Sequence, residues 1–116
     1  MDNIVDSFND YRAKMNDKIL ADNNKIVKRI FNLDTNAFQE GALPKKTKEL
    51  LGLGNSLVLR CDDCVRYHLE SCYEMGFTKE EVVEAMSVSL LIGGTIVIPH
   101  LRRAYEYWEA LEVKNS

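Results

Sequence analysis

The side chains of this sequence that could do chemistry gather in one short segment, at Cys61, Cys64, His68 and Cys72. On a helix that advances roughly 100° per residue, positions three and seven residues apart return to nearly the same face. The first two cysteines and the histidine are therefore predicted to share one face, with Cys72 one turn further along it. Cysteines three residues apart on a helix have Cα atoms about 5 Å apart, a separation that a disulfide tolerates.

Two further residues could make this pair reactive. His68 follows Cys64 by four residues, so its imidazole can lie against that sulfur and stabilise a thiolate or relay its proton. Eleven residues separate Glu49 from Cys61, and a helical hairpin could bring the Glu49 carboxylate to His68. Taken singly, each residue also has a structural interpretation: Glu49 as a solvated surface group, His68 as a satisfied histidine and Cys72 as a small core residue.

A zinc site is the alternative interpretation of the same spacing, with Cys61, Cys64, His68 and Cys72 as four ligands. Along a helix that rises ~1.5 Å per residue, the outermost two ligands lie roughly 16 Å apart. Zinc–ligand bonds of about 2.0–2.3 Å cannot gather that span, so zinc binding would require a non-helical segment or ligands from another chain. Zinc is therefore the weaker interpretation, and we expect no metal; no organic cofactor is expected either.

The elements that must position these residues are predicted to be helical throughout. The chain has 116 residues with only two prolines and six glycines, and its apolar residues recur with helical spacing. We expect an all-α fold of five to six helices in a single domain, residues 1–116. The first helix, over about residues 5–31, has a weak point at Asp22–Asn24. Residues 32–41 are predicted to form a turn, with one helical turn at most around 37–40.

The later helices carry clearer end signals. They are predicted over about residues 44–58, 61–76 and 78–93, with a last helix from between 95 and 98 to about 112. Gly76 suits a left-handed cap, and Thr78 with Glu81 forms a capping box. Gly52 and Gly54 inside one helix suggest a closely packed neighbour. The helix over 78–93 is apolar almost all round, which indicates burial in either the core or an oligomer interface.

Charge and composition exclude several classes of protein. The net charge is −3 without a basic stripe, which argues against a nucleic-acid partner. No apolar run approaches the roughly 20 residues that span a bilayer, and the acidic segment Met1–Asp6 shows no secretion signal. Three cysteines, two of them close together, do not make a secreted disulfide framework. We therefore expect a cytoplasmic protein with no membrane partner.

The pattern Glu49-x11-Cys61-x2-Cys64-x3-His68 resembles that of the carboxymuconolactone decarboxylase superfamily, most closely its alkylhydroperoxidase D (AhpD)-like branch. Later landmarks agree over roughly residues 37–110, at Gly41–Leu50, Gly76–Val82 and Gly93–Gly94. The resemblance implies an AhpD-like helical subunit with its redox site on a helical hairpin. It also implies homo-oligomers, either trimers or hexamers, which the aromatic last helix with Tyr105, Tyr107 and Trp108 would suit.

For the site, the resemblance implies that Cys64 attacks a peroxide and that Cys61 resolves the sulfenic acid to a disulfide. It gives His68 and Glu49 the role of a proton relay, and a dithiol reductant protein the role of partner. The peroxide or another small molecule is then the substrate. The positive end of the helix favours a thiolate at Cys61 instead, so the residues alone leave the attacking sulfur open.

One departure from the family pattern bears on the function. Asp63 stands before the second cysteine, where the peroxidase branch carries a histidine. Asp62 and Asp63 place negative charge beside the sulfurs, which disfavours a thiolate, although carboxylates also suit the start of a helix. Two alternatives follow: a non-enzymatic redox-sensing helical oligomer, or a decarboxylase-like enzyme on a small carbonyl or lactone substrate, with Glu49 and His68 as acid and base. His100 could line the same pocket.

Overall fold

Six α-helices and one short 3-10 helix make up the secondary structure of residues 3–116, the part of the chain that the computed structural model describes. The helices are α1 (Ile4–Ala21), α2 (Lys25–Ala37), α3 (Lys45–Val58), α4 (Asp62–Glu74), α5 (Lys79–Gly93), η1 (Thr95–Val97) and α6 (Ile98–Lys114). The predicted all-α fold of five to six helices is confirmed. Met1 and Asp2, part of the acidic segment considered above, lie outside the described residues.

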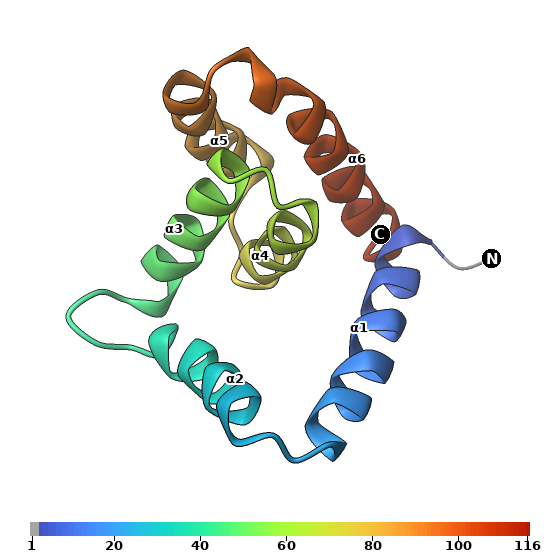
Figure 1. Ribbon diagram of the computed structural model, residues 1–116. Helices are drawn as coiled ribbons and strands as arrows, with labels where there is room; N and C mark the ends of the chain where they lie inside the picture. The colour runs from blue at the N-terminus through green and yellow to red at the C-terminus, as the bar shows by residue number, and fades with distance from the viewer. Residues whose placement is uncertain (1–2) are drawn as a thin grey trace.

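Helix α4 is the centre of the arrangement, and Figure 1 shows it nearly end-on between α3, α5 and α6. It forms a hairpin with α3 and packs against α6, while α5 packs on α3 and α1 packs on α6. Its inward face supplies Val65, Leu69 and Cys72 to the core. Half-buried Glu70 of the same helix accepts hydrogen bonds from Asn9 of α1 and from the Tyr107 hydroxyl of α6. Helix α4 is thereby fixed to its neighbours by both apolar and polar contacts.

The first helical segment is broken where the sequence predicts a weak point. Asn23 adopts a left-handed backbone with φ 62°, and the side chain of Asn24 caps α2 by accepting from the amides of Ile26 and Val27. The predicted turn over 32–41 is wrong in its first half, because α2 continues to Ala37 and no helical turn follows at 37–40. The polar residues after Phe31 form a solvated helix face rather than a loop.

The ends of the later helices agree closely with their predicted signals. The Thr78 hydroxyl accepts from the Glu81 amide at 3.1 Å, and the Glu81 carboxylate accepts from the Thr78 amide at 2.8 Å, so the capping box is present. Gly76 is left-handed with φ 88°. Helix α6 extends to Lys114, two residues beyond the predicted end. Within residues 3–116, no helix has the length and apolar character that crossing a bilayer requires.

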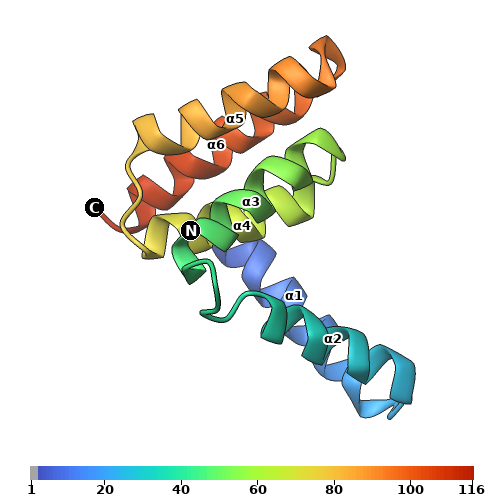
Figure 2. The ribbon, with the colours of Figure 1, turned by 90° about the vertical axis from the view of Figure 1, so that its left-hand side faces the viewer.

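Two helices leave apolar side chains uncovered in the single chain. Helix α2 has no buried residue, and Ile26, Ile30 and Leu33 lie on its exposed surface. Helix α5 buries Val82 and Met86, but its far side presents exposed Val88, Leu91 and Ile92. Figure 2 shows α1 and α2 projecting away from the layer of α5 and α6, so the two surfaces lie at opposite ends of the molecule.

Candidate active site

The redox pair sits at the turn of the α3–α4 hairpin. Cys61 is the N-cap of α4, and its Sγ accepts a hydrogen bond from the Cys64 amide at 3.3 Å. Cys61 and Cys64 form a disulfide with their Cα atoms 5.3 Å apart, close to the separation that their spacing predicts. Cys64 is exposed and Cys61 is half-buried, so solvent reaches the pair.

A tight connection places Cys61 at this point. Arg60 has a left-handed backbone with φ 61°, which few residues other than glycine and asparagine adopt readily. The Cys61 amide then donates to the Ser56 carbonyl at 3.1 Å, and the Arg60 amide donates to the Leu57 carbonyl at 3.0 Å. The chain reverses within a few residues, and the first turn of α4 begins directly beside the last turn of α3.

The hairpin brings Glu49 of α3 to His68 of α4, the contact that the sequence predicts. The Glu49 Oε2 atom lies 2.8 Å from His68 Nδ1, and only 3% of Glu49 and 9% of His68 are exposed. The interpretation of Glu49 as a solvated surface residue is therefore wrong. A carboxylate only accepts, so His68 Nδ1 donates to Glu49, and in the neutral form of this ring Nε2 carries the lone pair. A histidine in this state can accept a proton from a thiol.

The imidazole is held in place by its packing. A Cβ atom added to Gly52 would lie 2.6 Å from His68 Cε1, so only glycine leaves room for the ring. Phe38 covers the imidazole with ring centroids 5.1 Å apart, and Tyr67 meets it edge-on at 5.2 Å. The close neighbour that Gly52 predicts is thus the histidine itself. Gly54 faces α5, where its carbonyl accepts from the Ser89 hydroxyl at 2.9 Å.

A cavity of about 210 Å³ opens beside the exposed sulfur. We call it the Cys64 cavity; it is lined by Arg12, Asp34, Asp63, Cys64, Tyr67 and His68. Cys64 and His68 therefore face one space large enough for a small molecule. A second hollow of about 440 Å³, the α2–α3 cavity, shares His68 and is lined largely by Ala37, Phe38, Leu43, Leu51 and Leu59.

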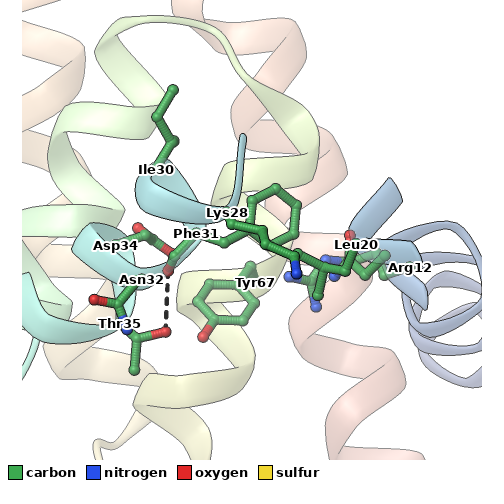
Figure 3. A pocket seen from close by; sticks show the side chains of 10 residues that line it. Arg12, Leu20, Lys28, Ile30, Phe31, Asn32, Asp34, Thr35 and Tyr67 are labelled. Carbon is green, nitrogen blue, oxygen red and sulfur yellow. Dashed lines mark hydrogen bonds between the residues drawn. The ribbon is translucent and has the colours of Figure 1, made fainter. Parts of the chain in front are cut away.

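A wider hollow of about 800 Å³ lies between α1 and α2 and shares Arg12, Asp34 and Tyr67 with the Cys64 cavity. Figure 3 shows Tyr67 of α4 at its back, with residues of α2 on one side and Arg12 of α1 on the other. The Arg12 guanidinium lies 4.5 Å from the centre of the Tyr67 ring. Burial raises the pKa of the Tyr67 hydroxyl, and the charge of Glu49 adds to that rise.

The two carboxylates beside the sulfurs differ in their surroundings. Asp63 is exposed and lies 3.9 Å from Arg66 one turn along the helix. Asp62 accepts from His100 Nδ1 at 2.8 Å and from the Arg103 guanidinium at 3.2 Å. The expectation that His100 lines the substrate pocket is wrong for the Cys64 cavity, because its imidazole is turned to Asp62 instead.

Cys72 is separated from the redox pair although it lies on the same helix. Its side chain is fully buried and its thiol is free. Burial raises the pKa of this thiol to about 12, with a smaller contribution from the negative charge of Glu49. The interpretation of Cys72 as a core residue is confirmed. Among residues 3–116, no group of three or more His, Cys, Asp or Glu residues is placed to hold a metal ion.

The geometry of this site can be set beside known proteins. The sequence model of the carboxymuconolactone decarboxylase family matches residues 24–107. The chain belongs to this family. The match includes the whole α3–α4 hairpin, and with it Glu49, both linked cysteines and His68.

Solved structures of carboxymuconolactone decarboxylase family proteins share the fold. Two crystal structures of one Thermotoga maritima protein are 48% and 47% identical to this chain, with TM-scores of 0.90 and 0.89. They cover 95% and 94% of this chain, and 98% and 92% of their own chains are matched. One is described with a suggested involvement in an antioxidative response. An apo structure from Legionella pneumophila is 26% identical, with a TM-score of 0.77 over 93% of this chain and 94% of its own.

Two curated relatives are uncharacterised proteins. One, from Cupriavidus necator, is 31% identical over 75 residues, which make up 65% of this chain and 66% of the relative. The other, from the cox locus of Paracoccus denitrificans, is 30% identical over 67 residues, which make up 58% of this chain and 60% of the relative. The matched segment thus falls just short of two thirds of either relative.

Replacing Gly52 by alanine tests the packing of the imidazole. Because the new methyl group overlaps the His68 ring, we expect Gly52→Ala to lower the free energy of unfolding by about 1–3 kcal/mol. Gly54→Ala is the matched control, since its Cβ atom would lie 3.4 Å from Ser89 Oγ, an ordinary contact distance, while alanine favours the helix. Urea unfolding at one protein concentration measures both, and equal stability of the two variants would contradict this account.

Alkylation of the reduced, folded protein tests the separation of Cys72 from the pair. Because burial holds the pKa of Cys72 at about 12, its thiol stays protonated near neutral pH and is shielded from reagent. We expect iodoacetamide at about pH 8 to label Cys61 and Cys64 and to reach Cys72 only after unfolding. Mass spectrometry of the digested protein gives the result, and rapid native labelling of Cys72 would refute it.

Proposed function

We propose that this protein is a thiol-dependent peroxidase of the AhpD-like type, a thiol–disulfide oxidoreductase that acts without a metal or organic cofactor. The observation that carries the proposal is the Cys61–Cys64 disulfide at a solvent-reachable cavity, backed by the buried His68–Glu49 pair. A disulfide that solvent reaches through one exposed cysteine is typical of labile, catalytic pairs rather than of structural ones. The antioxidative description of the Thermotoga maritima relative supports the same chemistry.

The first step takes place at Cys64. His68 Nε2 accepts the proton of the Cys64 thiol while Glu49 stabilises the resulting imidazolium through Nδ1. The thiolate attacks the outer oxygen of a peroxide R–O–O–H, so that an S–O bond forms and the O–O bond breaks. Cys64 becomes a sulfenic acid, and the alkoxide that leaves takes the proton back from His68 as an alcohol. The sulfur loses two electrons and the peroxide gains them.

The second step is resolution by Cys61. Its sulfur lies at the N-terminus of α4, where the backbone amides favour a thiolate. This thiolate attacks the sulfenic sulfur of Cys64, the S–S bond forms, and hydroxide leaves and takes a proton to become water. A dithiol reductant protein then returns the pair to two thiols and becomes a disulfide itself. Such a cycle requires a reducing compartment, so we place the protein in the cytoplasm.

A second candidate function rests on the α2–α3 cavity. Its lining includes His68 but neither Cys61 nor Cys64, and most of its surface is apolar. A small carbonyl or lactone compound there could use the His68–Glu49 pair as acid and base. This enzyme would keep its activity without either cysteine. A redox sensor, in contrast, would form the same disulfide without turning over any substrate.

Cysteine substitutions distinguish these functions. We expect Cys64→Ser to lower peroxide consumption coupled to a dithiol by at least ~100-fold, because no sulfenic acid can form. Cys61→Ser should instead stop after one turnover, with Cys64 trapped by a sulfenic-acid reagent such as dimedone. Cys72→Ala is the matched control and should keep the wild-type rate. Turnover of a small carbonyl or lactone compound that survives both Cys61→Ser and Cys64→Ser would show that the His68–Glu49 pair is catalytic without the cysteines. A reduced wild type that turns over none of several peroxides would favour the redox sensor.

We also propose that the chain forms homo-oligomers, trimers or hexamers, through the exposed apolar side of α5. Leu91 is 86% exposed and Ile92 is 70% exposed in the single chain, beside Val88. Large exposed apolar side chains that lie together on one helix mark interaction surfaces in soluble proteins. A second copy presents the same face and can cover it about a two-fold axis, as between the two halves of a hexamer, whereas a trimer would cover it with a different face of the next copy.

Sedimentation velocity tests this assembly. We expect the wild type to sediment as a multiple of the 13.3 kDa chain, and Leu91→Glu to shift it to the single chain, because a charge would have to be buried. Val113→Glu is the matched control, since Val113 is also 70% exposed but lies near the end of α6. A wild type that sediments as one chain would refute the proposal.

A further inference from the structure

Three side chains, one from the first residue of α4 and two from α6, meet outside the Cys64 cavity. Asp62, the first residue of α4, accepts from His100 Nδ1 at 2.8 Å through one carboxylate oxygen. Its other oxygen accepts from Arg103 at 3.2 Å. The side chains of Asp62 and His100 are 30% and 19% exposed, so the contact is largely withdrawn from water. None of the three residues lines the Cys64 cavity.

Asp62 and Asp63, the two carboxylates beside the cysteine pair, differ in their exposure to water. Asp63 has a side chain that is 75% exposed, so water screens its charge. Asp62 follows Cys61 directly and is less exposed, so its charge acts more strongly on that sulfur unless nearby groups compensate it. The compensating groups come from α6, which is distant in sequence but packs against α4.

We propose that His100 and Arg103 are positioning residues of the redox site, which tie the Asp62 carboxylate to α6 and compensate its charge beside Cys61. The inference rests on the proposed function in one respect only, that the cysteine pair cycles between disulfide and dithiol. It assigns to α6 a part in the chemistry that neither the α3–α4 hairpin nor the Cys64 cavity requires.

The step that the cluster assists is the reduction of the disulfide. A thiolate of the dithiol reductant attacks Cys64 Sγ, the S–S bond breaks, and Cys61 leaves as a thiolate. The second thiol of the reductant then attacks the mixed disulfide, Cys64 leaves, and the reductant keeps the new disulfide. Two electrons pass to the pair. Because thiol–disulfide exchange is faster when the leaving thiolate is more stable, an uncompensated Asp62 would slow this step.

Charged groups from α1, α2, α3, α4 and α6 surround the Cys61–Cys64 pair. On the Cys64 side they are Arg12 of α1, Asp34 of α2, Glu49 of α3 through His68, and Asp63 with Arg66 of α4. On the Cys61 side they are Asp62 of α4 with His100 and Arg103 of α6. The two sulfurs therefore lie in different electrostatic surroundings, and substitutions in the cluster should act chiefly on Cys61.

Opposite effects of two substitutions test the proposal in the full-length reduced protein. The readout is the rate at which iodoacetamide alkylates Cys61 between about pH 6 and pH 10, followed by mass spectrometry. We expect Arg103→Gln to slow alkylation about threefold to tenfold near pH 7 and to move the pH profile upward, since the charge of Asp62 is then uncompensated. Asp62→Asn should accelerate alkylation and move the profile downward. The double variant should return close to wild type.

Further variants separate electrostatics from folding. His100→Ala should slow alkylation in the wild-type background and have no effect once Asp62 is asparagine. Arg103→Lys should keep close to the wild-type rate, and Arg102→Gln, at the exposed arginine beside it, is the matched control. Effects of the same sign for Arg103→Gln and Asp62→Asn, or none beyond the Arg102→Gln control, would overturn the proposal. No peroxide enters the assay, so a failure of the peroxidase proposal would leave its result intact.

Discussion

The hydrogen bond between Glu49 and His68 is the interaction on which the site depends. Both groups are withdrawn from water, and a buried carboxylate without a partner costs several kcal/mol. The pair is therefore tolerable only while α3 and α4 stay in register, so the hydrogen bond and the hairpin depend on each other. Position 52 must be glycine for the same reason, because the His68 imidazole occupies the space that a Cβ atom at this position would need. Removing one partner would leave the other buried and unpaired, a larger loss than the bond itself contributes.

The hairpin also gives its two sulfurs different chemistry. Cys64 faces a cavity together with His68, where a proton can be taken up and returned. Cys61 caps α4, where backbone amides point at its sulfur and Asp62 opposes them with negative charge. In the proposed cycle, attack at one sulfur and resolution at the other would follow from position rather than from residue type. The left-handed Arg60 before the cap places Cys61 at the helix end instead of inside the first turn.

The features that the sequence predicts correctly are mostly local ones. The capping box, the left-handed Gly76 and the disulfide spacing depend on residues three or four apart, and the structure has all of them. No local signal marks the full extent of α2, because a solvated helix face and a loop have similar composition. The contact between Arg12 and Tyr67 has no sequence signal for another reason: α1 meets α4 only through the tertiary fold, and no short spacing marks that contact. The same holds for His100 and its partner Asp62, which lie 38 residues apart.

Helix α2 lines the site although the single chain buries little of it. It has 13 residues and buries none of them, while isolated helices shorter than about 12–15 residues are marginal in water. Its capping by Asn24 contributes only about 1 kcal/mol. Yet Asp34 of α2 lines both the wider hollow and the Cys64 cavity. Burial of Ile26, Ile30 and Leu33 against another surface would stabilise α2 and, with it, this wall of the Cys64 cavity. The stability of α2 and the shape of the cavity beside Cys64 are therefore physically coupled.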